Sequence, residues 1–238
     1  TNNNEGRYSI YYQPLELSKG AVKQIYLSVP MQTIQKDFEI TLVNKKNQIV
    51  YRKYVTAQPL DPATILVGVL CERPADMSYL SAIHFAEQED YTGEYTKTVY
   101  LDSETFPNEQ SVINHFKVIV IDDFDTKLLS EKQREALLKW IQQGGICIIG
   151  TGVNASKTMS GLQNIVSVTS ENTVQRNIML AGQRVRADIA ELNLSEIEGV
   201  QTDVFENASL LSMGNGAVIL YNISLSLEPV ISTTGFVN

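Results

Sequence analysis

The sequence is poor in the residues that most often carry nucleophilic or metal-dependent chemistry. Its 238 residues include two cysteines, Cys71 and Cys147, and two histidines, His84 and His115. Two cysteines are too few for a disulfide framework. Each lies in an apolar stretch, so both are predicted to be buried free thiols.

Long apolar runs and an excess of basic residues are also absent. Stretches such as residues 118–121 and 146–149 are far shorter than the roughly 18 residues of a membrane-spanning helix. The formal net charge is −8, and an acidic surface repels both nucleic acid and anionic lipid head groups. Any membrane contact is therefore assigned to segments outside this sequence. The chain begins without Met on polar residues 1–6, which resemble a linker and leave a signal or anchor upstream open.

Hydrophobic residues make up 43% of the sequence, enough to form a core. Residues 8–12, 25–29 and 38–43 alternate apolar and polar side chains, and the polar turn 44–47 separates the last of these from residues 49–55. Alternation of period two predicts strands with one buried face. We therefore predict a small immunoglobulin-like β-sandwich over residues 1–60. About 55 residues give a thin core, so pairing with a neighbouring segment could be needed to complete the sandwich.

Residues 57–62 contain two prolines and predict a domain boundary. Beyond it, strands alternate with helices, which favours an open, mostly parallel α/β sheet with helices on both faces over residues 61–238. The predicted strands are residues 65–70, 96–101, 117–121 and 146–149, and the predicted helices are residues 74–85, 109–116 and 130–143. A β-rich insertion is expected around residues 165–205, with strands at 165–168, 174–180 and 200–204 and a helical turn at 187–194. Strands 209–213 and 217–223 follow, joined by a tight hairpin.

The helix that starts after Ser130 has the clearest local signals. Gln133 completes a capping box with Ser130, and Gly144 is placed to end the helix in a left-handed conformation.

Residues 119–150 carry the pattern strand, Leu-Ser-x-x-Gln, Ala-Leu, Trp, Gly-Gly, strand. This resembles class I glutamine amidotransferase-like domains of bacterial membrane-anchored proteins. Residues 214–219 are similar to the closing strand of those domains, and residues 17–30 to the β-domain that often precedes them. The resemblance implies a flavodoxin-like core and an extracytoplasmic, cell-surface setting in a Gram-positive bacterium.

The sequence departs from that family at the residues of catalysis. An amidotransferase needs a cysteine at a Gly-x-Cys-x-Gly elbow, with a histidine later in the chain. Ile149 replaces the second glycine of the Gly145-Ile146-Cys147 stretch, and both histidines precede Cys147. The triad cannot be assembled in its usual order, so no catalytic residue is assigned.

Polar residues follow three of the predicted parallel strands, where α/β sheets bind ligands. A ligand cleft could include Cys71, Glu72, Asp122, Asp123, Thr151 and Gly152. The same residues also fit a strand-end cysteine without a base and carboxylates that cap loops. The sequence has no glycine-rich phosphate loop after the first strand, so no nucleotide cofactor is predicted. No His or Cys lies near the aspartates in the sequence, so no metal is predicted.

We therefore predict a non-catalytic interaction or scaffold region of a membrane-anchored extracytoplasmic protein, with a protein or a cell-envelope polysaccharide as partner. The alternatives are a hydrolase or ligand sensor that uses the strand-end cleft, and a sugar-binding module.

Overall fold

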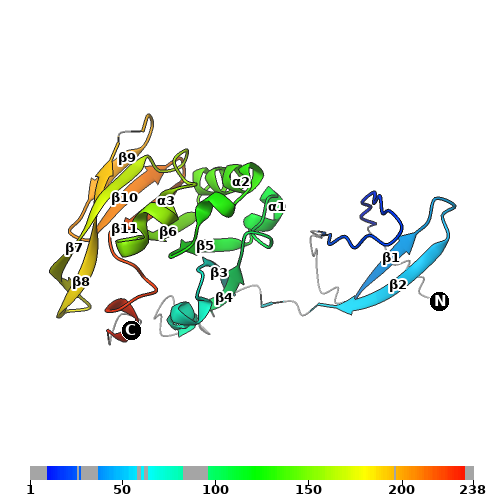
Figure 1. The fold of residues 1–238 in the computed structure, drawn as a ribbon, viewed down its shortest axis with the longest axis horizontal. Helices are drawn as coiled ribbons and strands as arrows, with labels where there is room; N and C mark the ends of the chain where they lie inside the picture. The colour runs from blue at the N-terminus through cyan, green and yellow to red at the C-terminus, as the bar shows by residue number, and fades with distance from the viewer. Residues whose placement is uncertain are drawn as a thin grey trace, which may run out of the picture. The chain divides into compact units, whose positions relative to one another are not determined.

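The chain divides into two compact units, residues 1–60 and 61–238. The computed structural model describes residues 10–25, 27, 37–57, 60–61, 64–82, 96–195 and 197–233 (Figure 1). The division falls within the proline-containing segment 57–62.

The described part of the first unit contains a β-hairpin. Strands β1 (Asp37–Val43) and β2 (Ile49–Thr56) pair antiparallel. The side chain of Asn44 closes the turn, because its Oδ1 accepts hydrogen bonds from the backbone N–H groups of Lys46 (2.8 Å) and Gln48 (3.0 Å). Asn47 takes the left-handed conformation that the turn requires, with φ 58°.

The other strands predicted for this unit are not present in its described part. Residues 10–25 and Leu27 have no regular secondary structure, so the prediction there is wrong. Tyr8 and residues 28–29 lie outside the described residues. No described residue from 10 to 61 is buried, so the alternating side chains face no core that would hold them as strands.

The second unit is built on a seven-stranded sheet with the order β4-β3-β5-β6-β11-β10-β9. The first five strands in this order, β4, β3, β5, β6 and β11, are parallel to one another. Strand β10 pairs antiparallel with β11, and β9 pairs antiparallel with β10. The fold is therefore mixed α/β with a mostly parallel sheet. The strands are β3 (Ile65–Leu70), β4 (Thr96–Leu101), β5 (Phe116–Ile121), β6 (Ile146–Gly150), β9 (Gln201–Val204), β10 (Ala208–Met213) and β11 (Gly216–Tyr221).

The described helices are short except for one. They are α1 (Gln110–Ile113), α2 (Glu131–Gln142) and α3 (Ala155–Met159), with 3₁₀ helices η1 (Pro74–Ala82), η2 (Thr126–Leu128), η3 (Gly152–Asn154) and η4 (Val230–Ser232). Helix α1 is shorter than the predicted 109–116, because Phe116 already belongs to β5. The predicted capping box of α2 is confirmed: Ser130 Oγ accepts from Gln133 N, and the Gln133 side chain accepts from Ser130 N.

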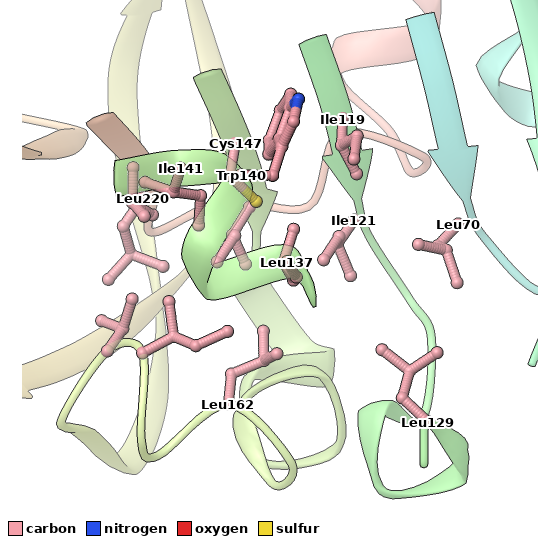
Figure 2. Packing of buried hydrophobic residues seen from close by; sticks show 14 of the residues in the cluster. Leu70, Ile119, Ile121, Leu129, Leu137, Trp140, Ile141, Cys147, Leu162 and Leu220 are labelled. Carbon is pink, nitrogen blue, oxygen red and sulfur yellow. The ribbon is translucent and has the colours of Figure 1, made fainter. Parts of the chain in front are cut away.

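The main core lies between α2 and one face of the sheet. In Figure 2, Leu137, Trp140 and Ile141 of α2 lie against the sheet residues Ile119 and Cys147. Trp140 is fixed further, because its Nε1 donates to the carbonyl oxygen of Phe116 (3.2 Å). Helices α1, α2 and α3 all contribute to this core.

The opposite face of the sheet is covered differently. Val69 and Val120 form a second core that η1 closes through Met77 and Leu80, together with Leu225. Among the described residues this face is therefore covered by a 3₁₀ helix and an irregular segment, whereas the sequence predicted helices on both faces.

A long hairpin follows α3. Strands β7 (Val168–Leu180) and β8 (Gln183–Leu194) pair antiparallel as a separate two-stranded sheet. The helical turn predicted at residues 187–194 is wrong, because Ala187 and Ile189 pack with Ile178 on one face of the hairpin. The strand predicted at residues 165–168 is also wrong up to Val168, since residues 163–165 form a turn and residues 166–167 have no regular secondary structure.

The predicted tight hairpin of residues 213–217 joins β10 and β11. Met213 pairs with Gly216, so the two-residue loop is Gly214-Asn215, with φ 59° at Gly214. None of the helices in the described residues has the length and apolar composition needed to cross a bilayer.

Leu137→Ala should destabilise the second unit strongly. Leu137 is fully buried, and removing a buried leucine side chain typically costs roughly 2–5 kcal/mol. Urea denaturation followed by circular dichroism measures this loss. The control Leu128→Ala removes a 59% exposed side chain and should shift the free energy of unfolding by less than about 0.5 kcal/mol. Equal effects of both variants would contradict the packing.

Candidate functional site

The carboxyl ends of the parallel strands meet at one edge of the sheet. We call this the carboxyl edge and define it as residues 71–73, 122–125 and 222–226, which follow β3, β5 and β11, together with residues 150–152, which begin at the last residue of β6. The chain passes from β3 to β4 on one side and then to β5 on the other. The gap between β3 and β5 is therefore the topological switch point, where open α/β sheets usually bind ligands.

Asp122 is the most completely bonded side chain of the carboxyl edge. It is fully buried. Its Oδ1 accepts from Leu225 N (2.9 Å). Its Oδ2 accepts from Ser224 Oγ (2.8 Å), Ser226 N (3.0 Å) and Ser226 Oγ (2.5 Å). The carboxylate thus ties the segment after β11 to the end of β5.

Two glycines leave room for this arrangement. A Cβ on Gly150 would lie 1.9 Å from Asp122 Oδ1, and one on Gly152 would lie 2.7 Å from Ser224 N. Gly152 also has φ 57°, a conformation that favours glycine. The edge therefore depends on small residues at the end of β6.

Burial raises the pKa of Asp122 above its ordinary value, and the donors from Ser226, Leu225 and Ser224 offset part of this rise. Because every bond to its oxygens comes from an N–H or O–H group, the carboxylate acts here as an acceptor. All of the described hydrogen bonds to its oxygens come from residues 224–226, so its role in the geometry is to hold the chain.

A charged network lies at the switch point. Lys157 Nζ, from α3, is 2.8 Å from Glu72 Oε1 and 2.8 Å from Asp123 Oδ1. Asp123 Oδ2 is also 3.9 Å from Arg73 Nη2, and Arg73 pairs in turn with Asp76 (3.4 Å). Asp123 has φ 47°, which is uncommon for a residue other than glycine. The network joins the ends of β3, β5 and α3.

The residue at the strand-to-helix turn after β6 is Thr151. It is fully buried, its Oγ1 donates to the carbonyl oxygen of Tyr221 (2.7 Å), and its N–H donates to that of Ile223 (2.9 Å). Its hydroxyl is thus engaged in binding the end of β11 and is closed to solvent.

Both thiols are buried. Cys71 Sγ donates to the carbonyl oxygen of Arg73 (3.6 Å), and burial raises its pKa. Cys147 lies inside β6 with no exposed surface, and burial raises its pKa to about 12. Neither sulfur is therefore a thiolate at neutral pH.

His115 lies at the opposite end of β5. It precedes Phe116, the first residue of the strand, whereas Asp122 follows the last. At about 3.3 Å per residue, the backbone positions of His115 and Asp122 are roughly 20 Å apart. His84 lies outside the described residues.

The structure therefore brings all six predicted cleft residues to one edge. The sequence did not indicate the residues that complete their contacts, Ser224, Ser226 and Lys157. The two serines are about a hundred positions from Asp122, and nothing in a single sequence pairs positions so far apart. Within the described ranges, no three His, Cys, Asp or Glu side chains are grouped to hold a metal ion.

Comparison with known sequences gives one family. A domain of unknown function (DUF8726) matches residues 1–58. No curated protein matches the chain significantly.

Solved structures give weak likenesses. Cytoplasmic Protein STM1381 from Salmonella typhimurium LT2 is 11% identical, with 73% of this chain and 95% of that chain covered and a TM-score of 0.48. Cytoplasmic Protein STM3548 from Salmonella typhimurium is 10% identical, with 85% and 92% covered and a TM-score of 0.48.

A catalytic mutant of Gan42B, a GH42 β-galactosidase from G. stearothermophilus, is 10% identical. The match covers 71% of this chain but only 28% of the enzyme, with a TM-score of 0.42. At these TM-scores the likenesses define neither the fold nor the activity of this chain.

Asp122→Asn should destabilise the second unit by about 3 kcal/mol or more, because an amide nitrogen would face donors that are then left unpaired in the interior. Chemical denaturation measures the loss, and hydrogen exchange should show faster exchange at the amides of Leu225 and Ser226. The matched control is Asp203→Asn, at an exposed position on β9. A variant as stable as the control would contradict the anchoring role.

Proposed function

We propose that this chain is a non-catalytic interaction or scaffold region of an extracytoplasmic, membrane-anchored bacterial protein. In this proposal residues 61–238 are a catalytically inactive, flavodoxin-like relative of class I glutamine amidotransferase-like domains. Residues 1–60 belong to an immunoglobulin-like β-domain that acts as a spacer. The family and the setting rest on the sequence pattern of residues 119–150 and on the similarity of residues 17–30.

The observation that carries the non-catalytic reading is that the polar groups of the carboxyl edge bind one another. Ser224 and Ser226 enclose Asp122, and the hydroxyl of Thr151 donates a hydrogen bond to a main-chain carbonyl oxygen. A catalytic nucleophile has to be open to substrate and adjacent to a base. Thr151 occupies the strand-to-helix turn and meets neither condition.

The missing base supports the same proposal. A general base has to lie within hydrogen-bonding reach of the nucleophile, about 3 Å or one bridging water away. His115 lies at the far end of β5, and neither thiol has a histidine partner among the described residues. Cys147 cannot be reached by substrate because it is packed inside the main core.

Exposed apolar side chains support a role in protein contact. Phe38, Ile40, Leu42, Tyr51 and Val55 lie on one face of the β1–β2 hairpin by their register. All of them are at least partly exposed, with Tyr51 at 56%. Exposed apolar patches on soluble proteins commonly mark surfaces that a partner covers.

A second candidate is a ligand sensor, and the charged network at the switch point favours it. Glu72 is about half exposed, and it pairs with Lys157, which also pairs with Asp123, where ligands of this fold class bind. A ligand carrying hydroxyl or charged groups, such as a sugar of the cell envelope, could exchange contacts with these side chains. No described contact assigns a bond-breaking step to them.

Thiol alkylation separates the proposals. If the region is non-catalytic, iodoacetamide at pH 7 should leave Cys71 and Cys147 unmodified in the folded protein for hours, because the raised pKa values keep both as thiols. Labelling should rise as the pH approaches the pKa of Cys71, and both should react at once in denaturant. Mass spectrometry measures the extent of alkylation at each cysteine.

Cys71→Ser is the control that assigns the signal, since it removes the more accessible sulfur. Rapid alkylation of Cys71 at neutral pH, slowed by a glutamine or amino-sugar substrate, would overturn the non-catalytic proposal. The sensor alternative predicts slow alkylation together with a change in the rate when a ligand binds.

A further inference from the structure

A shallow recess lies beside the carboxyl edge, between the start of α2 and the segment after α3. Its volume is about 410 Å³, within the range of small-molecule sites. The residues that line it are Lys127, Arg134, Ser160, Gly161, Gln163 and Asn164.

The charge of the recess is opposite to that of the whole chain. The net charge of the protein is −8, yet the charged side chains in the lining are the cations Lys127 and Arg134. Neither forms an ion pair with any residue that the structure describes. Two cations that share a recess and form no ion pair with a described residue favour an anionic ligand.

Arg134 is held in position for such a ligand. Its Nη1 donates to the carbonyl oxygen of Leu129, and the guanidinium makes no other hydrogen bond within the described part of the chain. The planar group is therefore oriented by one bond and keeps further N–H donors for an oxyanion.

The walls of the recess are joined by buried contacts. Thr126 Oγ1 accepts from Gly161 N (2.8 Å) and donates to the carbonyl oxygen of Thr158 (2.7 Å). A Cβ on Gly161 would lie 2.2 Å from the carbonyl oxygen of Thr126, so only glycine permits this approach. The two sides of the recess are thus fixed relative to each other before any ligand binds.

The polar lining extends beyond the two cations. Gln163 Nε2 donates to the carbonyl oxygens of Met159 and Val168, which fixes its side chain and leaves Oε1 as an acceptor. Asp125 Oδ1 accepts hydrogen bonds from Ser160 Oγ (3.3 Å) and from Lys127 N (3.1 Å), so one carboxylate lies next to the lining at its base. An anion is favoured at the side chains of Lys127 and Arg134, which carry the positive charges of the lining, with hydroxyl groups toward the amides.

We propose that this recess binds a phosphate ester of a polar, sugar-sized molecule, with the phosphate on Lys127 and Arg134 and hydroxyl groups on Gln163 and Asn164. The volume exceeds that of a bare phosphate ion, and the amide side chains suit hydroxyl groups. The site uses none of Cys71, Asp122 or Asp123, so it is independent of the function proposed above.

Titration of the ¹⁵N-labelled protein with glucose 6-phosphate at constant ionic strength tests the proposal. Backbone amide signals of residues 160–164 should shift and saturate, and glucose or added chloride alone should not reproduce the shift. Lys127→Gln should weaken binding by on the order of tenfold, since it removes one charge-assisted contact. Lys132→Gln removes the same charge from α2 outside the recess and should bind as the wild type does.

Arg134→Lys keeps the charge but not the planar fork, and it should also weaken binding because the proposal places the phosphate on the guanidinium. Shifts that match the chloride control, or equal affinity in the wild type and Lys127→Gln, would overturn the proposal.

Poly(glycerol phosphate) distinguishes a polymer from a free phosphate ester as the source of the phosphate group. Tighter binding per phosphate than glucose 6-phosphate assigns the site to a polymer, and equal or weaker binding assigns it to a free phosphate ester. A negative result here leaves the thiol experiment, and the function it tests, unaffected.

Discussion

The buried carboxylate of Asp122 is the interaction on which the arrangement of the carboxyl edge depends. A carboxylate removed from water is costly unless donors replace its hydration. Here Ser224, Leu225 and Ser226 supply those donors. Because the bonds come from the segment after β11, they fix that segment against β5. Gly150 has to lack a side chain for the same reason. One buried charge therefore sets the course of the chain across the end of the sheet.

That constraint also limits the chemistry available at this edge. A ligand or catalytic site in an open α/β sheet uses strand-end residues with free polar groups. In this chain the hydroxyl of Thr151, the carboxylate of Asp122 and the thiol of Cys71 are all directed at main-chain or side-chain partners of the protein itself. Charged groups that remain accessible, such as Glu72 and Lys127, lie around these anchors. The accessible charged groups of this edge are therefore distinct from the buried groups that hold its chain together.

Prediction from sequence succeeded where local patterns decide the structure. The capping box of Ser130 and Gln133, the apolar strand 65–70 and the hairpin at residues 213–217 were all indicated by residues within a few positions of one another. It failed at residues 187–194, where the partner decides: β8 is a strand because β7 pairs with it. It failed at residues 165–167, whose apolar side chains Ile165 and Val166 are buried without belonging to a strand. It failed also at residues 10–25, where alternating side chains meet no core among the described residues.

The sequence alone determined that an α/β unit follows the boundary at residues 57–62, that Cys147 lies within an apolar strand, and that the six candidate cleft residues follow parallel strands. These conclusions depend on spacing along the chain. Only the tertiary structure decided that Asp122 is an internal acceptor, that Lys157 joins Glu72 to Asp123, and that Lys127 and Arg134 share a recess. Such contacts join residues brought together by the order of strands in the sheet, which a single sequence does not specify.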